Sequence, residues 1–146
     1  MTLPPVDLRV GDCQELDRIL GERIYEFNAK ATGYHDGESF ACVQRDESGA
    51  MIAGVSGYTW GGCCQVSYLW VAEEHRGHGL GRALLQAAER HARNQGCVIA
   101  LLSSHDFQAP AFYRRLGYHE QASVRDHPVG HSNIIYSKRL TGTDDR

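Results

Sequence analysis

The chain has 146 residues, a length typical of one domain, and a domain of this size buries about two-thirds of its unfolded surface. Its 15 basic and 18 acidic side chains give a formal net charge of −3, which argues against a general DNA- or RNA-binding protein. Its 42% hydrophobic content is ordinary for a globular protein, and no apolar run approaches the ~20 residues that span a bilayer.

The first half of the chain is predicted to form a helical segment and three strands. Over residues 13–30, apolar side chains recur at spacings of three and four, which predicts one or two amphipathic helices with an interruption allowed at Gly21. Residues 40–43 and 51–58 are β-prone and flank a turn cluster, so they predict a hairpin. Residues 64–71 are apolar on both faces, which is typical of a central strand.

The second half of the chain is predicted to contain a crossover unit. A glycine-rich turn follows the central strand and leads into a helical stripe that runs from Leu80 to Ala92. The apolar run 97–102 then predicts a parallel strand, because a helix connects it to the strand before it. A short helix over 109–116 and two strands near 118–124 and 133–138 complete a mixed α/β sheet.

Neither the first residues of the chain nor the cysteines indicate secretion. The first seven residues lack the basic lead and the apolar core of a signal peptide, so we expect a cytoplasmic protein. The five cysteines form an odd number and show no Cys-x-x-Cys spacing. We therefore expect reduced, mostly buried thiols rather than disulfides or a zinc site, and no metal elsewhere.

The glycine-rich turn at residues 76–82 predicts an anion site. Glycines let the backbone turn tightly, and the first unpaired amides of the following helix point at one spot that favours a phosphate group. A dinucleotide fingerprint fails because Arg82 stands where the third glycine is needed, and a P-loop fails because no Gly-Lys-Ser or Gly-Lys-Thr follows. A purely structural turn without a ligand stays an alternative when the turn is considered alone.

A second motif gives the turn its context. With Arg76, Gly79 and Gly81 the turn fits Arg/Gln-x-x-Gly-x-Gly/Ala, and residues 109–118 look like Phe-Tyr-x-x-Leu-Gly-Phe/Tyr. In this order and spacing, the two motifs resemble those of the GNAT superfamily of N-acetyltransferases. The matched residues 69–118 cover about a third of the chain, and the N-terminal region resembles the family only in its helix content.

The resemblance implies one domain over residues 1–146, with a mostly antiparallel mixed sheet of six to seven strands and about four helices. It also implies that the turn binds the pyrophosphate of acetyl-CoA and that the preceding strand pairs with the pantetheine arm through its backbone. The implied cofactor contacts are Leu69, Trp70, Val71, Arg76, Gly77, His78, Gly79, Leu80, Gly81, Arg82, Ser104, Phe112 and Tyr113.

Transfer to an amine requires an acid for the departing thiolate and a base for the acceptor, because only a neutral amine attacks a thioester. Tyr113 stands at the family position for the acid, although an aromatic side chain there also suits packing against the sheet. The candidate bases are Glu73, His105 and Glu26, and Glu74 and a water chain are further alternatives.

Acidic and aromatic residues suggest where the acceptor binds. Carboxylates favour a cationic amine and aromatic rings can stack on a small ligand, so we expect acceptor contacts from Glu26, Tyr34, Trp60 and His131. A small-molecule amine is therefore the expected acceptor, and the resemblance together with a strand edge at the end of the chain makes a homodimer a further expectation. The alternatives are an acyl-CoA-binding module without turnover, a peptide or protein N-acetyltransferase, and an unrelated α/β protein.

Overall fold

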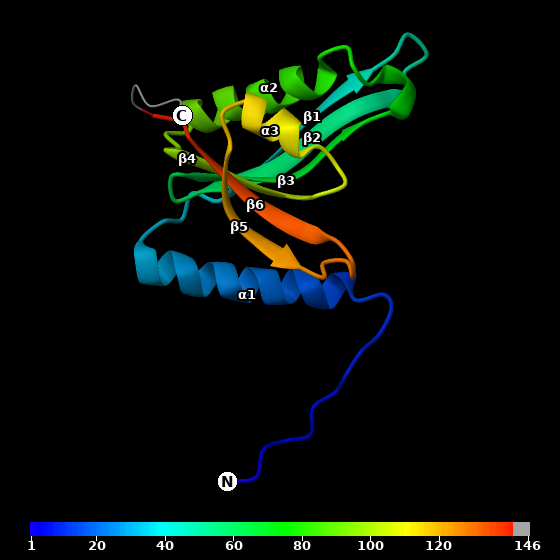
Figure 1. Cartoon of the computed structure of the whole chain (residues 1–146). Helices are drawn as coiled ribbons and strands as arrows, with labels where there is room; N and C mark the ends of the chain where they lie inside the picture. The colour runs from blue at the N-terminus through cyan, green and yellow to red at the C-terminus, as the bar shows by residue number, and fades with distance from the viewer. Residues whose placement is uncertain (142–146) are drawn as a thin grey trace. The chain divides into compact units, whose positions relative to one another are not determined.

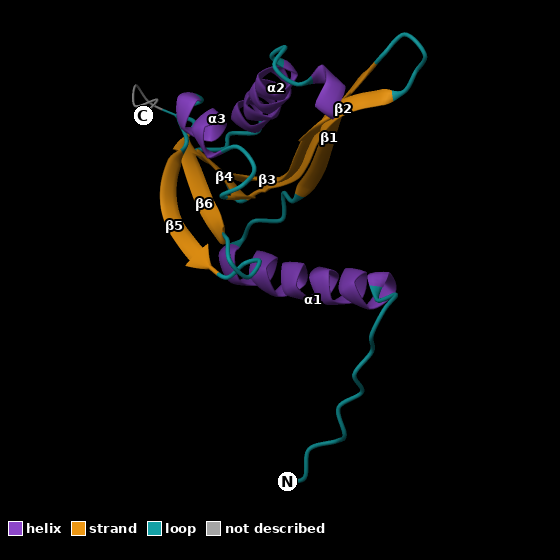
Figure 2. Ribbon diagram, turned by 45° about the vertical axis from the view of Figure 1, so that its right-hand side comes forward, coloured by secondary structure: helices purple, strands orange, loops and turns teal. Residues whose placement is uncertain are grey.

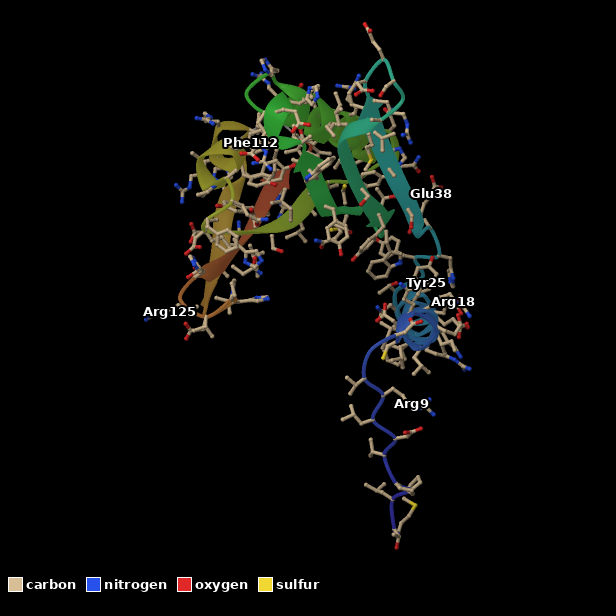
Figure 3. The ribbon with its side chains drawn as sticks, turned by 90° about the vertical axis from the view of Figure 1, so that its right-hand side faces the viewer. Arg9, Arg18, Tyr25, Glu38, Phe112 and Arg125 are labelled. Atoms are coloured by element: carbon tan, nitrogen blue, oxygen red, sulfur yellow. The ribbon has the colours of Figure 1, made fainter. Side chains whose placement is uncertain are left out.

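A computed structural model describes residues 1–141, and the chain divides into two compact units, residues 1–35 and 36–146. Within the first unit, an extended segment leads into a single helix, α1 (Gln14–Thr32). The helix runs without interruption past Gly21 and ends at Gly33, which has a left-handed conformation and donates its N–H to Ala29 O at 2.8 Å. Arg18, labelled in Figure 3, pairs with Glu15 and Glu22 on the helix surface.

The second unit contains a six-stranded sheet in the order β1-β2-β3-β4-β6-β5 (Figure 1). The strands are β1 (Glu38–Arg45), β2 (Met51–Trp60), β3 (Cys63–Val71), β4 (Ile99–His105), β5 (His119–Arg125) and β6 (Ser132–Arg139). All neighbours are antiparallel except β3 and β4. The predicted mixed, mostly antiparallel sheet is therefore confirmed, with six strands.

Helices α2 (Leu80–Asn94) and α3 (Pro110–Arg115) lie on the same face of this sheet (Figure 2). Helix α2 provides the crossover between the parallel strands β3 and β4, as the sequence predicts. With α1, the described residues contain three α-helices, and a 3₁₀ turn, η1 (Glu73–His75), is the remaining helical element. The sequence predicted about four helices, and η1 is too short to count as the fourth.

The core lies between α2 and the sheet. The apolar stripe of α2 is buried through Leu84, Leu85, Ala88 and Ala92, because these residues share one face at helical spacing. The strands contribute the alternate residues that face the helices. These are Ala53, Val55, Cys64, Val66, Ala100, Leu102, Ile134 and Tyr136.

A charged side chain also enters this core. Glu89 on α2 is only 4% exposed, and its carboxylate accepts hydrogen bonds from Tyr118 Oη at 2.8 Å and Lys138 Nζ at 2.9 Å. Burial and the adjacent carboxylate raise the pKa of Tyr118, so this phenol stays protonated and donates to Glu89. The cluster links α2 to β6, because Lys138 is a β6 residue.

All five cysteines are free thiols. Cys64 and Cys97 are buried, but Cys42 is exposed, so the expectation of mostly buried thiols is only partly correct. Burial raises the pKa of Cys64 to about 12, and a thiol with this pKa is unreactive at neutral pH. Within residues 1–141, no three His, Cys, Asp or Glu side chains are arranged to hold a metal ion. No helix in this part of the chain is long and apolar enough to cross a membrane.

Candidate active site

The parallel strands β3 and β4 separate soon after they meet. They pair only through Cys63–Gln65 and Ile99–Leu101, although β3 continues to Val71 and β4 to His105. Beyond Gln65, the edge of β3 that faces β4 therefore has no strand partner among the described residues. Unpaired N–H and C=O groups on such an edge can accept an extended ligand as if it were another strand.

A β-bulge lies where this separation begins. Tyr68 pairs with Ser56 and Val66 pairs with Gly57, so Ser67 is an extra residue on β3. A bulge bends its strand and redirects the backbone groups next to it. The bulge therefore helps to turn the second half of β3 away from β4.

The open edge of β3 leads directly to the glycine-rich turn. Arg76 Nε donates to Val71 O at 3.0 Å, so this side chain fixes the end of the strand. Gly79 is the N-cap of α2 with φ +84°, a left-handed conformation that residues with a Cβ adopt at a cost. Helix α2 begins without a side-chain cap and without an acidic residue in its first turn. Its first N–H groups and its positive dipole end are thus available to an anion.

The second glycine of the motif, Gly81, allows two helices to pack closely together. Gly81 lies in the first turn of α2, and a Cβ there would lie 3.3 Å from Cζ of Phe112, a residue labelled in Figure 3. Gly81 therefore lets the start of α2 pack closely against α3. Through Phe112, whose ring centroid lies 5.1 Å from that of Tyr113, this contact connects the turn to the candidate acid.

Tyr113 is a buried residue of α3, with 9% of its surface exposed. Its ring packs against Tyr136 at 5.5 Å between centroids. Burial raises the pKa of Tyr113, hydrogen bonding with Ser104 opposes this rise, and Tyr136 adds to it. The Tyr113 phenol is therefore protonated at neutral pH and can donate a proton.

Ser104 occupies the buried end of β4 beside Tyr113. Its hydroxyl donates to Gln108 Oε1 at 3.0 Å, and the His105 backbone N–H donates to the same oxygen at 2.6 Å. Gln108 thus holds the turn between β4 and α3 in place. No sequence pattern indicates this role, because glutamine fits any exposed turn equally well.

A cluster of imidazole and aromatic rings lies at the same end of β4. His105 stacks on Phe107 at 5.2 Å, and His127 meets His105 edge-on at 5.4 Å between centroids. His131 Nδ1 lies 3.2 Å from Asp106 Oδ1, and the second oxygen of Asp106 accepts the Ser132 N–H at 3.0 Å. Asp106 was not predicted, and it orients the His131 ring in the way that acid–base sites use.

The structure separates two of the predicted acceptor contacts. Trp60 pairs with Cys63, and Cys63 pairs with Ile99 at the start of β4. His131 adjoins Asp106, which follows the end of β4. The seven residues of β4 place these two positions about 20 Å apart at 3.3 Å per residue.

The predicted bases also fall into different parts of the molecule. Glu73 lies in η1, directly after the open edge of β3, and is exposed. His105 lies at the end of β4, and its Nδ1 is buried without a hydrogen-bond partner among the described residues. Glu26 belongs to α1 and Tyr34 follows this helix, so both residues lie in the first compact unit.

Comparisons with known proteins agree on one family. The family model described as acetyltransferase (GNAT) family matches residues 9–118. A blasticidin-S acetyltransferase from Streptomyces morookaense is 38% identical over 103 residues, 70% of this chain and 74% of that protein. A streptothricin acetyltransferase from Streptomyces lavendulae is 35% identical over 57% of this chain and 45% of that protein. A crystal structure of an acetyltransferase from Bacillus cereus aligns with a TM-score of 0.76 and 34% identity, covering 92% of this chain and 97% of the other.

Proposed function

This chain belongs to the acetyltransferase (GNAT) family and is an acyltransferase that uses acetyl-CoA, and we propose that its acceptor is the primary amine of a small molecule. The names of relatives that acetylate antibiotics support the small-molecule amine. The observation that carries the use of acetyl-CoA is the open edge of β3, which leads into the uncapped N-terminus of α2. An extended pantetheine arm that ends in a pyrophosphate needs these two features in this order. The proposed enzyme is a single domain formed by the whole chain, because the family model spans both compact units.

The cofactor is proposed to bind mainly through the backbone. Residues 69–71 offer the strand edge for the pantetheine arm, and residues 77–81 offer amides for the pyrophosphate. The side chain of Arg76 fixes the end of β3 at this site, since its Nε donates to Val71 O. Phe112 supports it by packing against Gly81.

The proposed reaction is direct transfer within a complex of enzyme, acetyl-CoA and amine. The amine nitrogen forms a bond with the carbonyl carbon of the acetyl group, and the bond from that carbon to sulfur breaks. The departing thiolate takes the phenolic proton of Tyr113. The phenol is protonated before this step because burial raises its pKa. The acceptor loses one proton to a base before attack and a second proton afterwards. The second proton restores the Tyr113 phenol, so the products are an amide, a thiol and one released proton.

The base is proposed to come from the open end of the β3–β4 separation. Glu73 and His105 both lie there, one at the end of each strand. His131 contacts Phe107, which stacks on His105, and His131 and Phe107 are proposed to line the acceptor site. Glu26, Tyr34 and Trp60 stay predicted acceptor-site residues, and a cytoplasmic homodimer stays a prediction for the whole chain.

The names of two relatives suggest the kind of amine. One acetylates blasticidin S and one acetylates streptothricin, and we propose an antibiotic or other small molecule that carries a cationic amino group as the acceptor. Purified enzyme is expected to release free thiol from acetyl-CoA with blasticidin S, streptothricin or spermidine. The control acceptors are acetate, glucose and a peptide with a free N-terminus.

Each outcome of this panel has a definite meaning. Turnover confined to neutral or anionic acceptors contradicts the cationic-amine proposal, and turnover confined to the peptide favours a peptide N-acetyltransferase. Binding of CoA in calorimetry without thiol release for any amine favours an acyl-CoA-binding module.

The turn predicts a strong effect of Gly79→Val on cofactor binding. Valine resists the left-handed backbone that Gly79 adopts, so the first amides of α2 should lose their alignment. We expect CoA affinity, measured by calorimetry, to fall by at least about ten-fold. Gly96→Val is the matched control, because Gly96 has a similar φ of +80° and follows the opposite end of α2. Equal loss of CoA affinity in both variants would show a general folding defect instead.

A further inference from the structure

A pocket of about 270 Å³ lies between α2, α3 and β6, next to the proposed pyrophosphate site. We propose that this pocket binds the 3′-phosphate of coenzyme A through Arg82 and Arg115. The proposal rests on the proposed function and adds a specificity: the enzyme should distinguish CoA from dephospho-CoA, which lacks only this phosphate.

The charges that line the pocket favour an anion. Four cationic side chains and one carboxylate line it: Arg82, Arg93, Arg115, Lys138 and Glu89. The carboxylate is already engaged by Lys138 at 2.9 Å, and Arg93 lies 4.0 Å from it and donates from Nε to Leu140 O. This half of the pocket therefore has a net charge of +1, and its only carboxylate is already paired.

The other half carries two arginines without a counterion. Neither Arg82 nor Arg115 has an acidic partner within residues 1–141. By contrast, the neighbouring Arg114 pairs with Glu120 at 3.5 Å. Two guanidinium groups beside the amide of Gln86 suit a phosphate monoester, which carries close to two negative charges and several acceptor oxygens.

The position of these arginines fits the geometry of the cofactor. Arg82 lies one helical turn after the N-cap Gly79, and Arg115 lies one turn after Phe112. Because Phe112 packs at Gly81, the two arginines lie where α2 and α3 meet. In CoA, the pyrophosphate and the 3′-phosphate are attached to the same ribose. A second phosphate site must therefore lie within one sugar of the first, and Arg82 meets this condition because it is one helical turn from Gly79.

Calorimetry with two nucleotides tests the proposal directly. CoA and dephospho-CoA are titrated into the wild-type enzyme, Arg115→Gln, Arg82→Gln and the control Arg114→Gln. We expect the wild-type enzyme to prefer CoA by about ten-fold or more. Arg115→Gln and Arg82→Gln should each remove most of this preference by weakening CoA binding alone. Arg114→Gln should keep it, because its side chain pairs with Glu120 instead.

The affinity for dephospho-CoA serves as the folding control within each variant. Equal wild-type affinity for the two nucleotides overturns the 3′-phosphate proposal and leaves the proposed acetyltransferase function intact. A variant that weakens both nucleotides equally also overturns it, since the arginine would then serve the pyrophosphate. If neither nucleotide binds the wild-type enzyme, the proposed function and this inference fail together.

Discussion

Replacing Tyr113 with phenylalanine is expected to lower kcat by about 10²–10⁴-fold, the usual contribution of a general acid, and to leave the affinity for acetyl-CoA nearly unchanged. The ring is buried against Tyr136, and phenylalanine preserves that packing. In the proposed mechanism, the variant lacks the proton that Tyr113 donates to the departing thiolate. Steady-state kinetics with a saturating amine measure kcat, and calorimetry with CoA measures binding.

Tyr136→Phe is the matched control for this variant. It removes the same hydroxyl from the adjacent ring, and Tyr136 Oη is buried without a hydrogen-bond partner among the described residues. Its removal should therefore leave kcat within about two-fold of the wild-type value and should not destabilise the fold. If Tyr113→Phe lowers cofactor binding and turnover by equal factors, Tyr113 is a packing residue and not the acid.

Replacing Lys138 with methionine is expected to lower the free energy of unfolding by about 3 kcal/mol, because it leaves the carboxylate of Glu89 buried without its closest cation. Urea denaturation followed by tryptophan fluorescence measures this change, since Trp60 and Trp70 both lie in the sheet. Lys30→Met is the matched control on exposed α1 surface and should change stability by less than about 0.5 kcal/mol.

A double variant separates the buried charge from simple loss of packing. In Glu89→Gln with Lys138→Met, the amide carbonyl still accepts from Tyr118 and no charge is left in the core. We expect the double variant to be more stable than Lys138→Met alone. If it is less stable, the lost contacts of the lysine stem, and not the unpaired carboxylate, cause the destabilisation.

The sequence predicted those parts of the fold that depend on local patterns. The apolar stripe from Leu80 to Ala92 predicted α2, and its position between two apolar runs predicted the parallel crossover, because periodicity and chain order are both readable along the chain. The uninterrupted α1 shows the limit of such patterns. Gly21 lowers helix propensity, but a single glycine in a helix of 19 residues does not break it.

The candidate site depends more on contacts between distant residues, which the sequence does not encode locally. Asp106 and His131 are 25 positions apart and meet only because β4 and β6 are neighbours. Arg82 and Arg115 share a pocket because Gly81 lets α2 approach Phe112. The point at which β3 and β4 separate depends on pairing register and on the bulge at Ser67, neither of which has a sequence signature.

The short pairing between β3 and β4 also divides the sheet into two half-sheets, β1-β2-β3 and β4-β6-β5, joined by three residue pairs. Glu89 of α2 connects this helix to the second half-sheet, because its carboxylate accepts a hydrogen bond from Lys138 of β6. A pantetheine arm along the free edge of β3 would act as a seventh strand that fills the gap. Binding of the cofactor should therefore also stabilise the folded sheet. Saturation with CoA at 100 times its Kd should add about 2.7 kcal/mol to the free energy of unfolding.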